Sequence, residues 1–302
     1  MAPEWLAAVI RSALDAEIRE CWRPASGSLA DTFVVELAST GRERVVCKRG
    51  GASIWTGDAI EPLVAARVRE ETGLPIPTVL AQGSLAAVDG PARWAVYEYR
   101  DGTRPTVETP ARRGRLAARA GTLLGRLHAS FSFDRRGGLA RTDGELAVRP
   151  AAGVTILESR LARRFVTAGV ATAPAVPPVL AHGDFRPANL LLRGERVTAV
   201  LDWGNAHVTH PGLSLARAEV RFADLPAATG SERVELREQF RTAYAARHSL
   251  PAFVVSELPR FKALWIAQAA RNLAGVARTT RGRTQLRRQL REHLRVGASD
   301  IC

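Results

Sequence analysis

The sequence predicts an α+β protein of two lobes, with a strand-rich first third and a helix-rich remainder. Two observations carry this prediction: the predicted strands gather in the first hundred residues, and predicted helices dominate after residue 112. A third is the composition, because 302 residues with 46% hydrophobic and 24% charged content are typical of a globular chain. Disordered and fibrous classes are thereby excluded, and we expect the boundary between the lobes near residues 99–103.

Hydrophobic spacing and turn residues define the elements of the first lobe. Apolar residues at helical spacing predict a helix over residues 3–20. A second helix is predicted over 60–72, because Pro62 is tolerated in a first turn and Gly73 ends the helix. Strands are expected at 32–37, 44–48 and 94–100, with a turn at 39–41 between the first two and a proline-punctuated extended segment at 74–84.

The second lobe is predicted to be mainly helical. Residues 131–150 are rich in Gly and Arg and are expected to form a loop, while 172–178 is proline-rich and predicts a stiff linker. Residues 179–206 predict three short strands separated by a loop and a turn. Helices are expected over 112–130, 155–168, 213–222, 231–247, 256–277 and 284–295.

The cysteines and the N-terminus point to a reducing compartment. Cys21, Cys47 and Cys302 are scattered and odd in number, which does not favour a disulfide framework or a zinc site. No run approaches the ~20 apolar residues of a membrane span, and the N-terminus predicts an amphipathic helix rather than a signal peptide. A cytoplasmic protein without a membrane span is therefore expected.

The chain is strongly basic, with a formal charge of +13 that comes from 41 arginines and only two lysines. Such a charge can attract nucleic acid, anionic lipid or an anionic substrate. Basic and acidic residues alternate through most of the chain, which favours a solvated surface over a functional basic patch.

The chemistry of the chain is concentrated in residues 182–189, HGDFRPAN, and in Asp202-Trp203-Gly204. An Asp, an Asn five residues later and a second Asp after a short hairpin suit phosphoryl transfer. Asp184 can orient and accept the proton of an attacking hydroxyl. Asn189 and Asp202 offer the hard oxygen ligands that Mg²⁺ prefers.

This string resembles the catalytic loop of the aminoglycoside phosphotransferase and choline kinase-like family of small-molecule kinases. The resemblance implies a protein-kinase-like fold, with a nucleotide-binding N-lobe over 1–99 and a C-lobe over 100–302 that holds the catalytic loop and the acceptor. It also implies ATP or GTP with Mg²⁺ as cofactors and transfer of the γ-phosphoryl group to a hydroxyl of a sugar, amino alcohol, nucleoside or antibiotic-like molecule. No specific nucleic-acid partner is expected.

Lys48 lies where the family has its phosphate-binding lysine. In a chain that otherwise uses arginine, a lysine on a predicted strand is notable, because a compact ammonium and a planar guanidinium are not interchangeable in a phosphate pocket. Glu61 resembles the helix Glu that pairs with this lysine. Glu70 and Glu71 are rivals at the C-terminal end of the same helix, where carboxylates are less favoured.

Two further segments resemble nucleotide-contacting parts of the family. Ser26, Gly27 and Ser28 precede the first long strand, as does the family's phosphate-covering loop, whose backbone N–H groups face the phosphates. The strand end at Tyr97, Glu98 and Tyr99 resembles the hinge between the lobes, whose backbone would pair with adenine.

The chain departs from the family at two positions. Arg186 stands two residues after the catalytic Asp, where the family usually has His, and could stabilise the charge of the γ-phosphate. Ser214 replaces an Asp that normally supports the catalytic loop. His128 and His182 match positions that are usually structural in this fold.

The sequence defines the acceptor of the phosphoryl group less well than the nucleotide and metal site. Residues 226–302 hold 14 basic and six acidic residues, the wrong sign for a polycationic antibiotic. Glu219 is the one specific candidate for a substrate contact. A protein kinase is disfavoured because no activation segment follows Asp202. The alternative is a non-catalytic nucleotide-binding protein on this fold, or one that binds nucleic acid or a membrane surface, given seven arginines between 278 and 295.

Overall fold

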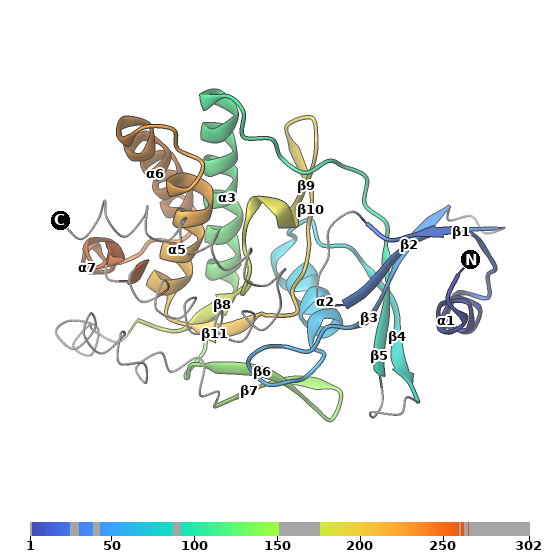
Figure 1. Cartoon of the computed structure of the whole chain (residues 1–302). Coiled ribbons are helices and arrows are strands. Elements are labelled where there is room, and N and C mark those ends of the chain that lie inside the picture. Colours follow the sequence, from blue (N-terminus) through green and yellow to red (C-terminus); the bar gives the residue numbers. More distant parts are fainter. Residues whose placement is uncertain are drawn as a thin grey trace, which may run out of the picture. The chain divides into compact units, whose positions relative to one another are not determined.

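A computed structural model describes residues 2–24, 30–38, 43–86, 92–150, 176–259, 261–262 and 265. The chain divides into two compact units, and each is described by itself (Figure 1). The first unit comprises Met1–Arg104, Leu139–Ala147 and Ala188–Ala206; the second comprises Pro105–Gly138, Val148–Pro187 and His207–Cys302. The two units are not separated by a single cut of the chain, because segments 139–147 and 188–206 group with the N-terminal part. The boundary between an N-lobe and a C-lobe at residues 99/100 therefore stays a prediction.

The first unit is built on a five-stranded antiparallel sheet of order β1-β2-β3-β5-β4. Helix α1 packs against one face of this sheet, as both ribbon views show. Because side chains alternate across a strand, Cys47 faces the core under α1 while its neighbour Lys48 faces the opposite side. The elements are α1 (Glu4–Leu14), β1 (Ile18–Trp22), β2 (Ala30–Leu37), β3 (Arg44–Gly50), β4 (Val79–Leu85) and β5 (Ala92–Glu98).

Helix α2 (Glu61–Thr72) begins with Pro62 in its first turn and ends at Gly73. Gly73 has a φ of 59°, a left-handed conformation in which glycine is favoured, and its N–H bonds to the Arg69 carbonyl. The hairpin β9 (Leu190–Arg193) and β10 (Arg196–Val200) completes the first unit. It is held at one end by the Val200 N–H, which donates to the Pro75 carbonyl.

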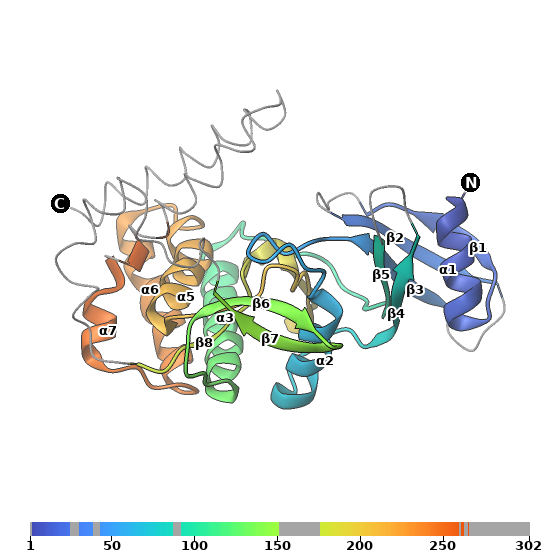
Figure 2. The same ribbon diagram turned by 90° about the horizontal axis from the view of Figure 1, so that it is seen from below.

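The second unit is mainly helical, as predicted. Helix α3 packs along α6 and also contacts α5, and the three lie side by side in both ribbon views (Figure 2). Two short strands, β8 and β11, pair antiparallel beside them, and the start of β6 pairs with β11. The elements are α3 (Pro110–Ser130), β8 (Val179–Ala181), β11 (His207–Thr209), α5 (Pro211–Glu219), the π-helical turn η4 (Val220–Asp224), α6 (Gly230–Ala245) and α7 (Ala252–Ser256). The short helix η3 (Pro187–Asn189) begins at the last residue of segment 148–187 and continues into the first unit.

Two predicted elements are wrong. The helix predicted over 3–20 ends at Leu14, because Asp15 adopts a left-handed φ of 50°, and strand β1 follows. The loop predicted over 131–150 contains a hairpin, β6 (Gly137–Thr142) and β7 (Glu145–Arg149). Asp143 and Gly144 both have positive φ there, which is the conformation of a tight hairpin turn.

Other predicted elements fall outside the described residues. They are the turn at 39–41, the helix at 155–168, most of the helix at 256–277, which begins earlier as α7, and the helix at 284–295.

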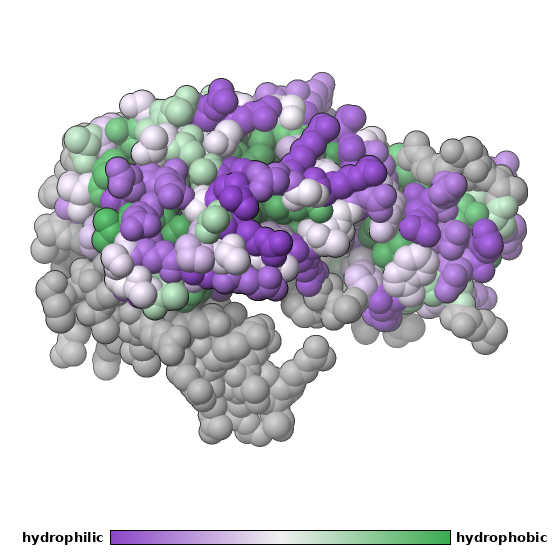
Figure 3. All heavy atoms as spheres, turned by 90° about the horizontal axis from the view of Figure 1, so that it is seen from above, coloured by the Kyte–Doolittle hydropathy of each residue, from purple (hydrophilic) through white to green (hydrophobic). Residues whose placement is uncertain are grey.

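Hydrophilic side chains are spread over the described surface in Figure 3, with smaller hydrophobic areas between them. The large exposed apolar side chains come from separate segments: Trp22, Ile54, Val234 and Val255. Singly exposed apolar residues are ordinary. In the described part of the chain, no helix is both long enough and apolar enough to cross a bilayer.

The contact between α3 and α6 generates a prediction. A methyl group on Gly121 would clash with the Phe240 carbonyl oxygen, which is helix backbone and cannot move aside. We expect Gly121→Ala to lower the free energy of unfolding by about 1–3 kcal/mol, the usual cost of overpacking. Gly230→Ala, at the start of α6, meets no atom within 4 Å and is the control. Equal thermal midpoints for the two variants would contradict this packing.

Candidate active site

Lys48 and Glu61 form a short ion pair in the first unit. The Lys48 Nζ donates to Glu61 Oε1 at 2.5 Å, and the two side chains are only 19% and 13% exposed. β3 supplies the lysine on the face opposite the α1 core, and the first turn of α2 supplies the carboxylate. The predicted pair is therefore present in the structure, whereas Glu71 is bound to Arg67 on the exposed side of α2.

Burial shifts the pKa of both Lys48 and Glu61. Burial lowers the pKa of Lys48, but the charges of Glu61 and Asp202 outweigh it, so the pKa is raised and the ammonium persists at neutral pH. Burial raises the pKa of Glu61, and Lys48 offsets only part of that effect. The ammonium is thus a permanent cation held in place by two carboxylates.

The β9–β10 hairpin brings Asn189 and Asp202 to one end. The Leu201 N–H donates to the Asn189 carbonyl at 2.8 Å, so Asp202 follows directly after the residue that closes the hairpin. The buried indole of Trp203 donates to the Val200 carbonyl and anchors the segment. Asp202 has a φ of 69°, which is uncommon for a residue other than glycine and which Asp tolerates better than most.

The Asp202 carboxylate fits a divalent cation. Its side chain is 52% exposed, and one of its oxygens lies 4.0 Å from Lys48 Nζ, longer than a hydrogen bond. With the amide oxygen of Asn189, it provides two hard oxygen donors. Mg²⁺ usually takes one or two protein carboxylates and completes its shell with waters and phosphate oxygens. Among the described residues there is no group of three or more His, Cys, Asp and Glu that could hold a metal.

The ion pair borders a solvent-connected recess of about 330 Å³ in the first unit, which Trp94 and Arg141 also line. The ring of Tyr97 lies 5.8 Å from Lys48 Nζ, so this side chain supports the ammonium.

The side chains of the other predicted hinge residues are engaged elsewhere. Glu98 accepts from Thr78, and the Tyr99 ring lies 5.7 Å from the Arg44 guanidinium. The pairing of this backbone with a nucleotide base stays a prediction. The proposed phosphate loop, Ser26 to Ser28, lies outside the described residues.

In the second unit, Asp184 sits on a turn shaped by its neighbours. Gly183 has a φ of 84°, which requires glycine or a strained residue. The Asp184 N–H donates to His182 Nδ1 at 3.2 Å, and the His182 ring is buried. His182 therefore orients the turn, as its predicted structural role requires.

Two arginines lie against the Asp184 carboxylate. Arg186 Nε is 2.8 Å from one oxygen and Arg217 Nη2 is 3.5 Å from the other. Burial alone would raise the pKa of Asp184, but Arg217, Arg186 and Arg221 outweigh it and lower the pKa. The carboxylate is ionised at neutral pH. Arg217 was not among the predicted site residues, because its position one helical turn after Ser214 carries no sequence motif.

Ser214 stands where the family has an acidic residue. Its hydroxyl contacts His128 Nε2 at 3.0 Å, and His128 Nδ1 contacts the Tyr244 hydroxyl at 2.8 Å. Burial lowers the pKa of His128 to about 3, so the ring is neutral and joins two hydroxyl groups. A hydrogen-bonded chain across α3, α5 and α6 replaces the carboxylate.

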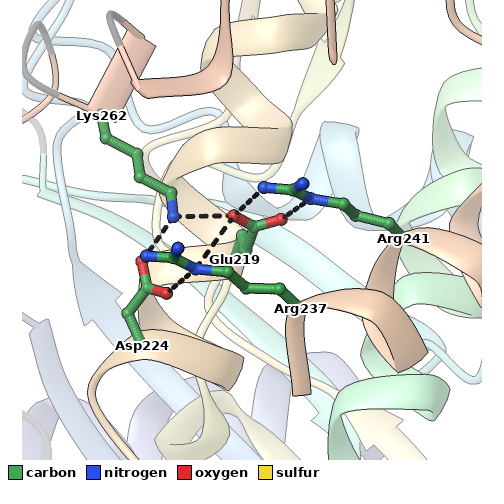
Figure 4. A network of polar contacts seen from close by, with 5 residues as sticks. All are labelled: Glu219, Asp224, Arg237, Arg241 and Lys262. Atoms are coloured by element: carbon green, nitrogen blue, oxygen red, sulfur yellow. Dashed lines mark hydrogen bonds and ion pairs between the residues drawn. The ribbon is translucent and has the colours of Figure 1, made fainter. Parts of the chain in front are cut away.

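The prediction that Glu219 contacts a substrate is corrected by the structure. Glu219 is fully buried, and its oxygens are occupied by Arg241, at 2.5 and 2.8 Å, and by Lys262, at 2.7 Å. Lys262 also binds Asp224 at 2.7 Å, and Arg237 binds Asp224 at 2.6 Å. Figure 4 shows the two carboxylates meeting these three cations in one network. Glu219 thus holds helices together.

The sequence profile described as the phosphotransferase enzyme family matches residues 21–253. The chain belongs to this family. The predicted α+β, protein-kinase-like fold of this phosphotransferase is confirmed by similar solved structures. No curated protein gave a significant sequence match.

Solved structures similar to this phosphotransferase share the fold at low identity. A thermostable mutant of aminoglycoside phosphotransferase APH(4)-Ia, in complex with AMP-PNP and hygromycin B, is 16% identical with a TM-score of 0.66, covering 98% of this chain and 97% of that one. A microcompartment-associated aminopropanol kinase is 17% identical with a TM-score of 0.67, covering 99% and 96%. Amicoumacin kinase hAmiN, in complex with AMP-PNP, Ca²⁺ and Ami, is 13% identical with a TM-score of 0.64, covering 99% and 94%.

The buried network of the phosphotransferase predicts a stability effect. Glu219→Gln removes the carboxylate that Arg241 and Lys262 share, leaving Lys262 with Asp224 alone, and breaking a buried pair in this way costs about 3–5 kcal/mol of unfolding free energy. The exposed Glu238→Gln is the control and should leave the stability unchanged. Both are measured by denaturant unfolding.

The same pair of variants predicts a pH dependence. Burial raises the pKa of Glu219, but Arg241 and Lys262 outweigh burial and lower it. The stabilisation is therefore complete above the unfolded pKa of about 4.3 and disappears as the pH falls through the lower folded value. The stability gap between wild type and Glu219→Gln should narrow below about pH 4; a constant gap would contradict the ionic assignment.

Proposed function

We propose that this phosphotransferase moves the γ-phosphoryl group of ATP to a hydroxyl of a small molecule, with its two units dividing the work. Lys48, supported by Glu61, binds nucleotide phosphates, Asn189 and Asp202 hold the divalent cation, and Asp184 acts on the acceptor. The observation that carries this proposal is the cluster of Lys48, Glu61 and Asp202, three charged groups joined within 4.0 Å.

Two observations support ATP as the nucleotide and a divalent cation as the metal. Two similar structures hold AMP-PNP, one of them with Ca²⁺, and the present chain has a buried ammonium beside an exposed carboxylate. A bound Mg²⁺ would supply positive charge that offsets the charge of the phosphates. Asn189 and Asp202 would hold it, and Asp202 has a left-handed φ of 69° just after β10.

Asp184 is suited to orient a hydroxyl rather than to act as a strong base. Its lowered pKa keeps it ionised, so it can accept a hydrogen bond from the acceptor at neutral pH. A weak base is sufficient, because phosphoryl transfer needs alignment and charge stabilisation more than early proton removal. Arg186, which pairs with Asp184, is the proposed source of positive charge near the transferred group.

The cellular setting follows from the same chemistry. We place the enzyme in the cytoplasm, where ATP and reduced thiols are abundant, and Cys21 and Cys47 are free. Its proposed partner is a small molecule.

Removing the acceptor-side carboxylate should separate binding from turnover. Asp184→Asn is nearly isosteric, and we expect turnover to fall by about 10²–10⁴-fold while nucleotide affinity stays within a few-fold. Asp134→Asn, an exposed Asp of the second unit, is the control. Steady-state kinetics and nucleotide titration decide the outcome. Loss of nucleotide affinity in Asp184→Asn would show that the division of labour is wrong.

The metal assignment has its own test. Asp202→Ala removes the exposed carboxylate, and we expect the Mg²⁺-dependent part of nucleotide affinity, measured by calorimetry with a non-hydrolysable ATP analogue, to disappear. Asp101→Ala, an exposed Asp of the same unit, should retain it. A folded Asp202→Ala variant that still shows the full metal effect would exclude Asp202 as a ligand.

A further inference from the structure

Among the described residues near Asp184, basic side chains outnumber carboxylates. Asp184 pairs with Arg186 and Arg217, and the neighbouring carboxylates of Glu219 and Asp224 pair with other cations. In this described part of the second unit, three carboxylates lie near six basic side chains: Arg186, Arg217, Arg221, Arg237, Arg241 and Lys262.

The Arg217 guanidinium has one long carboxylate contact among the described residues. Its contact with Asp184 is long, at 3.5 Å, and its side chain is 22% exposed. Its Nε is buried without a hydrogen-bond partner among the described residues. Burial lowers the pKa of Arg217 to about 10, and Asp184 offsets this only in part because Arg221 and Arg186 act in the opposite sense.

Arg217 also lines a recess that is open to solvent. The recess has polar groups at Thr209 and Ser214 and an aromatic wall at Trp265. Arg217 therefore touches both the predicted acceptor-orienting carboxylate and a solvent-connected recess.

We infer that the acceptor is a small alcohol that carries an acidic group, with Arg217 binding the acid and Asp184 the hydroxyl. The inference rests on the proposed function and names its substrate class. Because Arg217 Nη2 and Asp184 Oδ1 are 3.5 Å apart, one molecule reaches both when a few bonds separate its hydroxyl from its carboxylate. The guanidinium fork is the group that best matches a carboxylate or phosphate.

The reaction is balanced without a further reactant. The acceptor oxygen bonds to the γ-phosphorus, the bond from that phosphorus to the bridging oxygen breaks, and ADP leaves. The hydroxyl proton passes to Asp184 and then to solvent. Arg217 takes no part in bond making; it selects and orients the acceptor. A polycationic acceptor would meet the same arginines with like charge, which disfavours it.

The test compares acceptors that differ only in the acid. A nucleotide-consumption assay with Mg²⁺-ATP is run on glycerate and glycerol, serine and ethanolamine, gluconate and sorbitol, and a polycationic aminoglycoside. We expect kcat/KM for an acid to exceed that of its acid-free counterpart by about tenfold or more, the scale of a charge-assisted hydrogen bond. In Arg217→Gln this preference should vanish.

The control is Arg112→Gln, which removes an exposed arginine that pairs with Glu108, and it should keep the preference. The ratio of two acceptors within one variant is independent of the folded fraction, so poor folding of Arg217→Gln does not obscure the result.

Three outcomes overturn the inference. The first is a preference for the neutral or cationic acceptors with the enzyme active, which leaves the proposed function intact. The second is an equal loss of kcat for acid and neutral acceptors in Arg217→Gln, which would assign Arg217 to the phosphoryl group. The third is that the protein consumes no nucleotide with an acceptor of any class, and in that case the proposed function fails as well.

Discussion

A buried ammonium at Lys48 constrains most of the first unit. A desolvated charge is tolerated only beside an opposite charge, so α2 must place Glu61 against β3 to within hydrogen-bond distance. Helix α2 meets this requirement by beginning at Glu61, with Pro62 in its first turn, and it ends at Gly73. The sheet, its helix and the Asp202 segment are thus arranged around one cation that a phosphate group can approach.

In the second unit the charges are reversed. Here a carboxylate, Asp184, is surrounded by arginines, and the acids of the adjacent helices are committed to a separate network. Glu219 lies only two residues after Arg217, at the end of α5, so the network that fixes this helix end also fixes the guanidinium. Helix α5 therefore carries both Glu219, which fixes the packing of the helices, and Arg217, which contacts Asp184.

The sequence predicts those parts that local patterns determine. Lys48 and Glu61 pair as expected because both lie in elements whose start and face are set by spacing and by proline and glycine. The prediction for Glu219 is wrong because nothing local distinguishes an exposed helical Glu from one buried by Arg241 and Lys262, which lie 22 and 43 residues later in the chain. The roles of Arg217 and the Ser214–His128–Tyr244 chain depend on contacts across three helices in the same way. The missed hairpin at Asp143-Gly144 is different, since its turn signal was present locally and was outweighed by a Gly- and Arg-rich composition.

The two charged clusters of the second unit differ in their access to dissolved ions. The Glu219 carboxylate is fully enclosed, so mobile ions cannot reach it and the helix packing it supports should withstand high ionic strength. The arginines at Asp184 are 37% and 22% exposed and lie well within one screening length of solvent. Dissolved salt should therefore weaken the contacts of these two arginines at concentrations that leave the Glu219 network intact.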